Sequence, residues 1–187
     1  PLMVAAAEGH EGMVKLLLSQ QTSGGGGGRG GGGGGVGGGG GGGAAAAASS
    51  SSSSSSMAEA KDAEGASALL WACEFGHAAC VSLLHAACPS LLHAPDADGT
   101  MPLMRAAARG HLEVSRWLLG KGAALEAADA KGRTALARAA LEGRAQVLCA
   151  LLEAGADISV CDRHGGTVLH LAASRGHAAV LAALLHT

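Results

Sequence analysis

The 187-residue sequence contains neither asparagine nor tyrosine, and only 2% of its residues are aromatic. Hydrophobic residues still make up 48% of the chain, with alanine and leucine dominant. This balance is typical of helices packed on helices, because sheet cores favour aromatic and β-branched residues. The composition therefore argues against a core built on a β-sheet.

Charge is also scarce, because charged residues make up 15% of the chain and the formal net charge is −2. Such values give no electrostatic basis for binding nucleic acid or an anionic membrane surface. No apolar run approaches the roughly 18–20 residues of a membrane span, and no secretory leader follows Pro1. The absence of an initiator methionine predicts that the sequence is a fragment, with room for targeting signals outside it.

Cysteine is present five times, an odd number that does not suggest a disulfide framework. We therefore expect a reduced, intracellular protein, cytoplasmic or nuclear. Thiolate and imidazole are ligands of zinc, and both residue types gather in one stretch: Cys73, His77, Cys80, His85, Cys88 and His93. Their spacing does not resemble a Cys-x-x-Cys pair, so structural roles are favoured. No metal site and no cofactor are predicted.

A pattern of Asp-x-x-Gly, followed eleven residues later by a second glycine, recurs four times. The four copies begin at Asp62, Asp96, Asp129 and Asp162, at steps of 34, 33 and 33 residues. Self-similarity at such a period is typical of a stacked array in which each copy is one supersecondary unit. The unit must therefore be understood before any single residue is interpreted.

Each copy begins with a turn signal and then changes to helical periodicity. A hydroxyl residue, Ser67, Thr134 or Thr167, stands where it can cap a starting helix, and Pro102 fits a first helical position. A short apolar helix should end at a glycine, and a second helix should follow it. One such hairpin cannot bury its apolar face alone, so neighbouring hairpins should stack.

The sequence resembles the ankyrin repeat family in these features. Its Thr-Pro-Leu-His motif is present in degraded form at 67–70, 101–104, 134–137 and 167–170, and Gly-His occurs at 9–10, 76–77, 110–111 and 176–177. The resemblance covers residues 1–19 and 62–187. It implies an all-α solenoid of helix-turn-helix units with short β-turn or hairpin tips.

The expected domains are a partial repeat over 1–19, a disordered Gly/Ala/Ser-rich linker over 20–61, and four contiguous repeats over 62–95, 96–128, 129–161 and 162–187. Two alternatives remain open for the beginning of the chain. In one, the linker is an insertion and residues 1–19 dock onto the repeat that follows it. In the other, the native protein starts at Met57. We also expect a distorted joint after Leu84, and further repeats beyond Thr187.

The resemblance places partner contacts on turn tips and on the ends of first helices. In this sequence those offsets hold Glu64, Glu74, Phe75, Asp98, Arg109, Lys131, Arg133, Glu142, Arg163, His164 and Arg175. Their charge changes from acidic in the early copies to basic in the last, which suits an extended protein partner of opposite polarity. A merely solvated face is the alternative. Trp71 and Trp117 fall at offsets where the family buries leucine or valine, so both are expected in the core.

No catalytic set stands out, because the histidines and carboxylates recur with the repeat. The glycine tract lacks the lysine and hydroxyl of a phosphate-binding loop. We therefore expect a non-catalytic scaffold for protein–protein interaction, a monomer or part of a larger chain. The alternative is a regulatory or substrate-docking segment of a larger enzyme or channel whose active part lies outside the fragment. Nucleic-acid binding is a third hypothesis, with little charge to support it.

Overall fold

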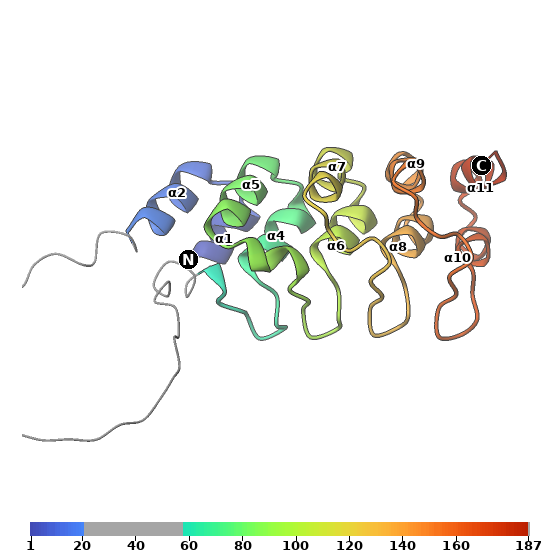
Figure 1. The fold of residues 1–187 in the computed structure, drawn as a ribbon, viewed down its shortest axis with the longest axis horizontal. Helices are drawn as coiled ribbons and strands as arrows, with labels where there is room; N and C mark the ends of the chain where they lie inside the picture. Colours follow the sequence, from blue (N-terminus) through green and yellow to red (C-terminus); the bar gives the residue numbers. More distant parts are fainter. Residues whose placement is uncertain (21–57, 187) are drawn as a thin grey trace, which may run out of the picture.

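The computed structural model describes residues 1–20 and 58–186, which form a row of helix pairs (Figure 1). The first helices of the pairs are α1 (Leu2–Ala7), α4 (Ala68–Phe75), α6 (Pro102–Arg109), α8 (Ala135–Leu141) and α10 (Val168–Ser174). The second helices are α2 (Glu11–Ser19), α5 (Ala78–Ala87), α7 (Leu112–Gly120), α9 (Ala145–Glu153) and α11 (Ala178–Leu185). The described part contains no β-strand, only the isolated bridges Lys61–Ser67 and Cys161–Thr167. The all-α helix-turn-helix solenoid is confirmed.

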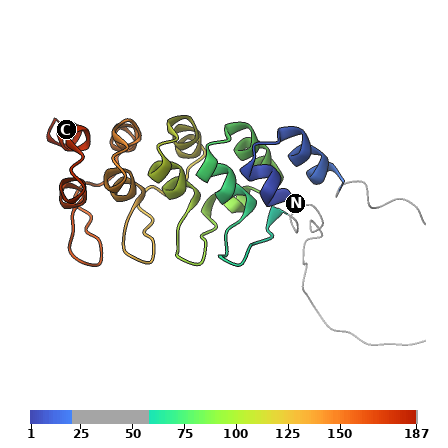
Figure 2. The same cartoon turned by 180° about the vertical axis from the view of Figure 1, so that it is seen from behind.

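The turns that precede the first helices hang below the row as parallel loops (Figures 1 and 2). Each is organised by its aspartate. In the turn at Asp129, one carboxylate oxygen accepts hydrogen bonds from the backbone N–H groups of Lys131 and Arg133, at 2.8 and 2.9 Å. The same two bonds form at Asp62, Asp96 and Asp162. The aspartate therefore satisfies backbone donors that the reversal of the chain would otherwise leave free.

The helix caps follow the residues that the sequence indicates. Ser67, Thr134 and Thr167 each accept a bond from the backbone N–H three residues on, at 3.4–3.5 Å. Met101 occupies the same position before α6 and makes no side-chain cap, but Pro102 begins that helix with a residue that needs no N–H partner. The turn aspartates contribute more to the local order than these long bonds do.

The core is a seam of alanine and leucine shared between neighbouring pairs. Leu69, Leu103 and Leu136 occupy one offset in successive first helices and are at most 1% exposed. Leu169 has the same offset in the last copy and is 38% exposed, because no described copy follows to cover it. The burial of this leucine therefore depends on stacking against the next pair.

A second inter-repeat link runs through the residue after each helix-ending glycine. His77 Nε2 lies 2.9 Å from Ala7 O, and His111 Nε2 lies 2.9 Å from Glu74 O. Arg144 makes the equivalent bond from Nε to Ala108 O at 3.1 Å. Gly76 must be glycine for two reasons, because its φ is 78° and a Cβ there would lie 2.4 Å from His111 Nδ1.

The first helix pair packs on the copy that starts at Asp62, with α1 against α4 and α2 against α5. This is the arrangement expected if residues 1–19 dock as a neighbour. Most of the predicted disordered linker, 21–57, lies outside the described residues. Its last residues are ordered, because Ala58 is fully buried and Lys61 forms a bridge with Ser67. The joint after Leu84 is irregular: α5 continues to Ala87, and a 3-10 helix, Pro89–His93, buries Leu91 and Leu92 before the next turn.

Candidate partner-binding groove

The turn tips form one hydrogen-bonded row along the array. Ala97 N–H donates to Glu64 O at 3.0 Å, Ala130 N–H to Asp98 O at 2.8 Å, and Arg163 N–H to Lys131 O at 3.0 Å. We call the four exposed positions in this row the tip row: Glu64, Asp98, Lys131 and Arg163. Backbone bonds fix the spacing of the turn tips that carry these side chains. Glu64, Asp98 and Lys131 stand second after their turn aspartates and Arg163 stands first. The charge of the tip row changes from two acids to two bases along the array.

A parallel set of side chains stands at the ends of the first helices. We call it the helix-end row, and its members are Phe75, Arg109, Glu142 and Arg175, all exposed. Phe75 is 50% exposed, as its offset predicts. His164 is exposed beside the tip row. The structure thus brings nine of the eleven predicted residues onto exposed positions of turn tips and helix ends.

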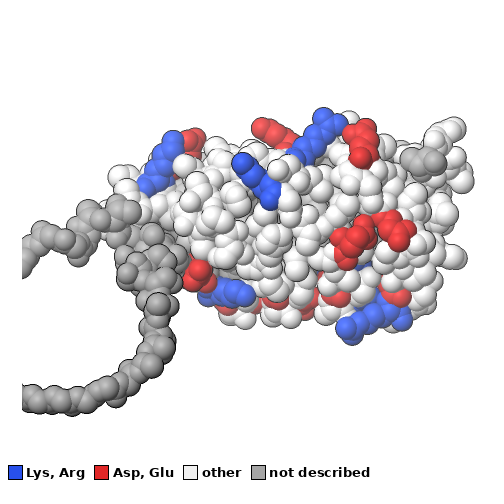
Figure 3. Space-filling model, in the orientation of Figure 1, with Lys and Arg blue, Asp and Glu red and all other residues white. Residues whose placement is uncertain are grey.

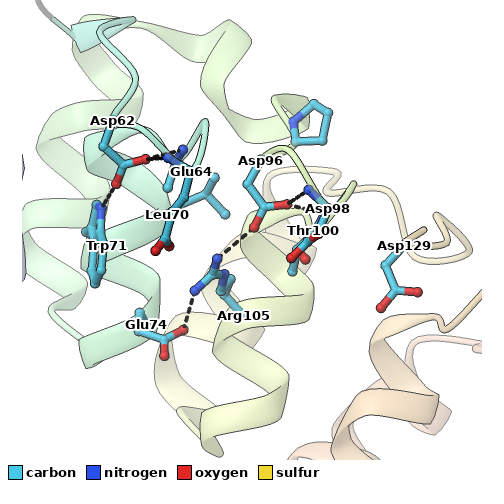
Figure 4. A network of polar contacts seen from close by, with 12 residues as sticks. Asp62, Glu64, Leu70, Trp71, Glu74, Asp96, Asp98, Thr100, Arg105 and Asp129 are labelled. Carbon is cyan, nitrogen blue, oxygen red and sulfur yellow. Dashed lines mark hydrogen bonds and ion pairs between the residues drawn. The ribbon is translucent and has the colours of Figure 1, made fainter. Parts of the chain in front are cut away.

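Glu74 is different, because its side chain is only 10% exposed and is held by two arginines. Arg105 Nη1 lies 3.3 Å from Glu74 Oε2, and Arg109 Nε lies 2.6 Å from Glu74 Oε1. Arg105 also reaches the turn aspartate of its own copy, with Nη2 2.7 Å from Asp96 Oδ2 (Figure 4). Glu74 is therefore engaged in linking two copies.

Arg133 is likewise turned inward, with its side chain 16% exposed and Nη2 3.0 Å from Asp129 Oδ2. Arg138 shares that carboxylate at 2.7 Å and donates to Thr100 Oγ1 in the preceding turn at 3.1 Å. Sequence reasoning missed Arg105 and Arg138. The signal was their shared offset, since each is the ninth residue after the turn aspartate of its own copy.

These ion pairs line a polar cleft between the turns and the first helices in the middle of the array. The cleft has a volume of about 310 Å³ and is lined by Glu74, Asp98, Thr100, Arg105, Ala108, Arg109, Arg138 and Glu142. Three carboxylates and three guanidinium groups balance there. The side chains that line the cleft therefore carry no net formal charge.

Both central turn aspartates titrate below their usual range. Burial alone raises the pKa of Asp96, but the hydrogen bonds from Arg105 and from the Thr100 N–H lower it further than burial raises it. Burial also raises the pKa of Asp129. Hydrogen bonds from the backbone and side chain of Arg133, from the Lys131 N–H and from the Arg138 side chain lower this pKa by more than burial raises it. Both groups are therefore carboxylates at neutral pH.

These shifts predict acid sensitivity. When pH falls below about 4, the unfolded chain takes up protons on these two carboxyls before the folded chain does, so folding stability decreases. The contribution is complete above about pH 5 and is lost as pH approaches the lowered folded-state pKa values. Urea unfolding from pH 6 to pH 3 should show this loss. An Asp96→Asn/Asp129→Asn variant should be less stable at pH 6 and lose less on acidification; an equal loss in both proteins would contradict the assignment.

The two tryptophans have different environments. Trp117 packs partly buried against the core, with its ring edge-on to His85 at 5.3 Å between centroids. Trp71 was expected in the core, but it is only partly buried and its indole Nε1 donates to Asp62 Oδ2 at 2.8 Å (Figure 4). The offset taken from the family indicates burial, whereas the neighbouring turn supplies an acceptor for the indole N–H, and the ring is only partly buried.

Two cysteines of the first complete copy, Cys73 and Cys80, are packing residues. Cys73 and Cys80 are buried, and burial raises the pKa of each thiol above its usual value, with Glu11 adding to the shift at Cys80. Neutral thiols are poor nucleophiles and poor metal ligands. Within 1–20 and 58–186, no three His, Cys, Asp or Glu side chains are placed to hold a metal ion. Nor is any helix of these ranges long and apolar enough to cross a bilayer.

Figure 3 shows one face of the array. Most of the described surface on this face is uncharged, and the charged side chains form small groups at the second helices, at the turn tips and, as an acidic group, at mid-height on the right. No broad patch of one sign covers the described atoms of that face. This distribution suits side-chain recognition at particular positions better than attraction to a polyanion.

Comparison with known proteins agrees with the architecture. A family model described as ankyrin repeats (3 copies) matches residues 45–129, 85–162 and 126–187, and a second, described as ankyrin repeat, matches residues 1–23. No curated protein matches the chain. Because the matched ranges cover well over half of the sequence and coincide with the stacked helix pairs, the chain belongs to the ankyrin repeat family.

Proposed function

We propose that this chain is a non-catalytic scaffold that binds an extended segment of a partner protein along the tip row and the helix-end row. Ankyrin repeats are generally protein–protein interaction modules, and their domains are typically non-catalytic. The observation that carries the proposal is the backbone bonding between successive turn tips, which holds exposed side chains in fixed register. Such an array offers a preorganised surface to a partner, and preorganisation lowers the cost of binding.

The proposed contacts are the nine exposed residues of the predicted set: Glu64, Phe75, Asp98, Arg109, Lys131, Glu142, Arg163, His164 and Arg175. Glu74 and Arg133 support this surface through their ion pairs with neighbouring side chains. The tip row is acidic in the early copies and basic in the later ones. A partner segment of opposite polarity would therefore be aligned in one direction, with electrostatics acting mainly on register and association rate.

The proposal predicts that charge reversal at the basic end weakens partner binding. A partner captured with the full chain and identified by mass spectrometry should lose affinity about tenfold or more for Arg163→Glu/Arg175→Glu at low salt, and the difference should shrink as salt rises. Arg116→Glu is the control, because Arg116 is 62% exposed on α7, away from both rows. If the double variant bound the partner with unchanged affinity, or if the control lost as much affinity, the groove assignment would be wrong.

A reducing, intracellular environment is part of the same proposal, and its support is the pair of buried, unpaired thiols Cys73 and Cys80. Oxidation would require either thiol to leave the core. Binding to DNA or RNA is the competing function, and it predicts a salt-dependent gel shift with the purified chain. A gel shift at physiological salt would favour that alternative over a protein partner.

A further inference from the structure

The junction between the first helix pair and the copy that starts at Asp62 differs from the junctions in the middle of the array. In the two middle copies the ninth residue after the turn aspartate is Arg105 or Arg138, which pairs with that aspartate. At the same offset the Asp62 copy has Trp71, and the first pair has Val4. The row of side chains that is cationic in the middle is therefore apolar at this end.

Because tryptophan stands at this offset in place of arginine, the turn at Asp62 also differs in charge from the turns of the middle copies. The Trp71 indole gives Asp62 a hydrogen bond at 2.8 Å but no positive charge. Lys61, the nearest lysine in sequence, donates to Pro95 O at 3.0 Å instead. Among the residues that the structure describes, Asp62 has no ion-pair partner. The hydrogen bond from Trp71, followed by that from the Ala66 N–H, lowers the pKa of Asp62, so the carboxylate is charged at neutral pH.

A shallow pocket opens at this junction. It has a volume of about 340 Å³ and is lined by Met3, Val4, Ala7, Glu8, Asp62 and Trp71. The walls are mostly apolar, and the two carboxylates are the only charged groups among the lining residues. Val4 is 59% exposed. Pockets of this size lie at the small end of ligand sites, so the space suits a side chain rather than a large cofactor.

The pocket is held from two sides. The bond from His77 Nε2 to Ala7 O at 2.9 Å ties α1 to the end of α4. Phe75 stacks on Trp71, with ring centroids 6.0 Å apart and planes 12° from parallel, and it is 50% exposed. The apolar surface therefore continues from the pocket along α4 to the helix-end row. Aromatic residues are enriched among the side chains that carry binding energy in protein interfaces.

We propose that this pocket, between α1 and α4, takes one bulky aliphatic or aromatic side chain of an extended partner segment, next to a lysine or arginine of that segment. The apolar walls bind the first side chain. Asp62 pairs with the second, and Glu8, whose Oε2 lies 3.0 Å from His10 Nε2, adds negative charge beside it. An acidic neighbour would meet two carboxylates and be rejected, since like charges across an interface cost affinity. This inference rests on the proposed function and names the partner residues that the early end of the groove recognises.

The test uses the full chain and a short synthetic peptide, acetyl-Ser-Leu-Arg-Ser-amide, followed by NMR. The two indole N–H resonances report on the two tryptophans, so Trp117 is an internal control for Trp71. Titration into the millimolar range should shift Trp71 saturably and leave Trp117 in place. Replacing the peptide's arginine by glutamate, or its leucine by alanine, should weaken binding on the order of tenfold. No shift at Trp71, equal shifts at both tryptophans, or equal binding of the glutamate peptide would overturn the proposal.

A matched pair of variants checks the place of binding. Val4→Arg introduces the residue type that fills this offset in the middle copies, and it should close the pocket and reduce peptide binding on the order of tenfold. Leu16→Arg changes a side chain of nearly equal exposure, 58% against 59%, on α2 outside the pocket, and should leave binding unchanged. Equal effects of the two variants would contradict the assignment, while melting curves confirm that both fold.

The peptide titration and the charge-reversal experiment test different claims, so either can fail without the other. If the peptide fails to bind but the Arg163→Glu/Arg175→Glu variant still loses a captured partner, only the pocket assignment is wrong. If the peptide binds selectively while that variant keeps its partner, the pocket stands and the polarity of the groove is wrong. A concentration-dependent mass that Val4→Arg abolishes would assign the pocket to a second copy of the chain, and so against a partner peptide.

Discussion

Replacing Leu136 by alanine should lower the free energy of unfolding by about 2–5 kcal/mol, the range for removing a buried leucine side chain and leaving a cavity. Leu136 lies in α8 and is 1% exposed, in contact with the shared core on both sides of its copy. Urea denaturation followed by far-ultraviolet circular dichroism measures the loss. A large value is expected because α8 packs against both α6 and α10, and neither can close the gap alone.

Leu169→Ala is the matched control, because it makes the same change at the same offset in the last copy. Leu169 is 38% exposed and lacks a described neighbour on one side. Its replacement should cost clearly less than that of Leu136, about 1–2 kcal/mol, because less area is buried and no closed cavity is left. Equal losses of unfolding free energy at the two positions would mean that this leucine stabilises the protein through contacts within its own hairpin alone. The idea of a seam shared between copies would then be wrong.

Replacing Asp129 by alanine should cost about 2–4 kcal/mol, since it removes the acceptor for two backbone N–H groups and the partner of two arginines. The Asp129 side chain is 1% exposed, so water cannot replace it without rearrangement. Arg138 would keep only its bond to Thr100. The same urea titration measures the change at pH 7, where the carboxylate is charged.

Asp162→Ala separates the two contributions. Asp162 accepts the same pair of backbone bonds, from His164 and Gly166, but forms no ion pair with an arginine in the described part of the chain. Its replacement should therefore destabilise the protein less than that of Asp129. A double variant, Asp129→Ala/Arg138→Leu, should recover part of the loss, because the unpaired buried cation is removed. If Asp129→Ala lowered the free energy of unfolding no more than Asp162→Ala, the ion pairs of Asp129 with its two arginines would not stabilise the fold.

The sequence predicts the repeat and its local geometry well, because the relevant interactions lie within a few residues. The hydroxyl caps at Ser67, Thr134 and Thr167 are confirmed, as are the turn aspartates and the glycine after each first helix. The residue after that glycine is equally predictable. Arg144 replaces histidine in one copy and still reaches the preceding copy through Nε.

Which individual charged side chains are exposed is harder to predict from the sequence. Glu74 and Arg133 stand at offsets that suggest exposure, but both are turned into ion pairs. The partners of Glu74 are arginines of the next copy, 31 and 35 residues away, so its orientation depends on which residues that copy carries. Spacing within one copy cannot contain this information. Arg133 and Trp71 differ from Glu74, because each bonds to the aspartate of its own turn, Asp129 or Asp62.

The measurement that tests the central claim most directly is amide hydrogen exchange of the full chain with and without a captured partner segment. Binding along the tip row and the helix-end row should slow exchange in the turns around Glu64, Asp98, Lys131 and Arg163 and at the ends of α4, α6, α8 and α10. Exchange in α2, α5, α7, α9 and α11 should stay unchanged. Protection that falls instead on those second helices would contradict the account.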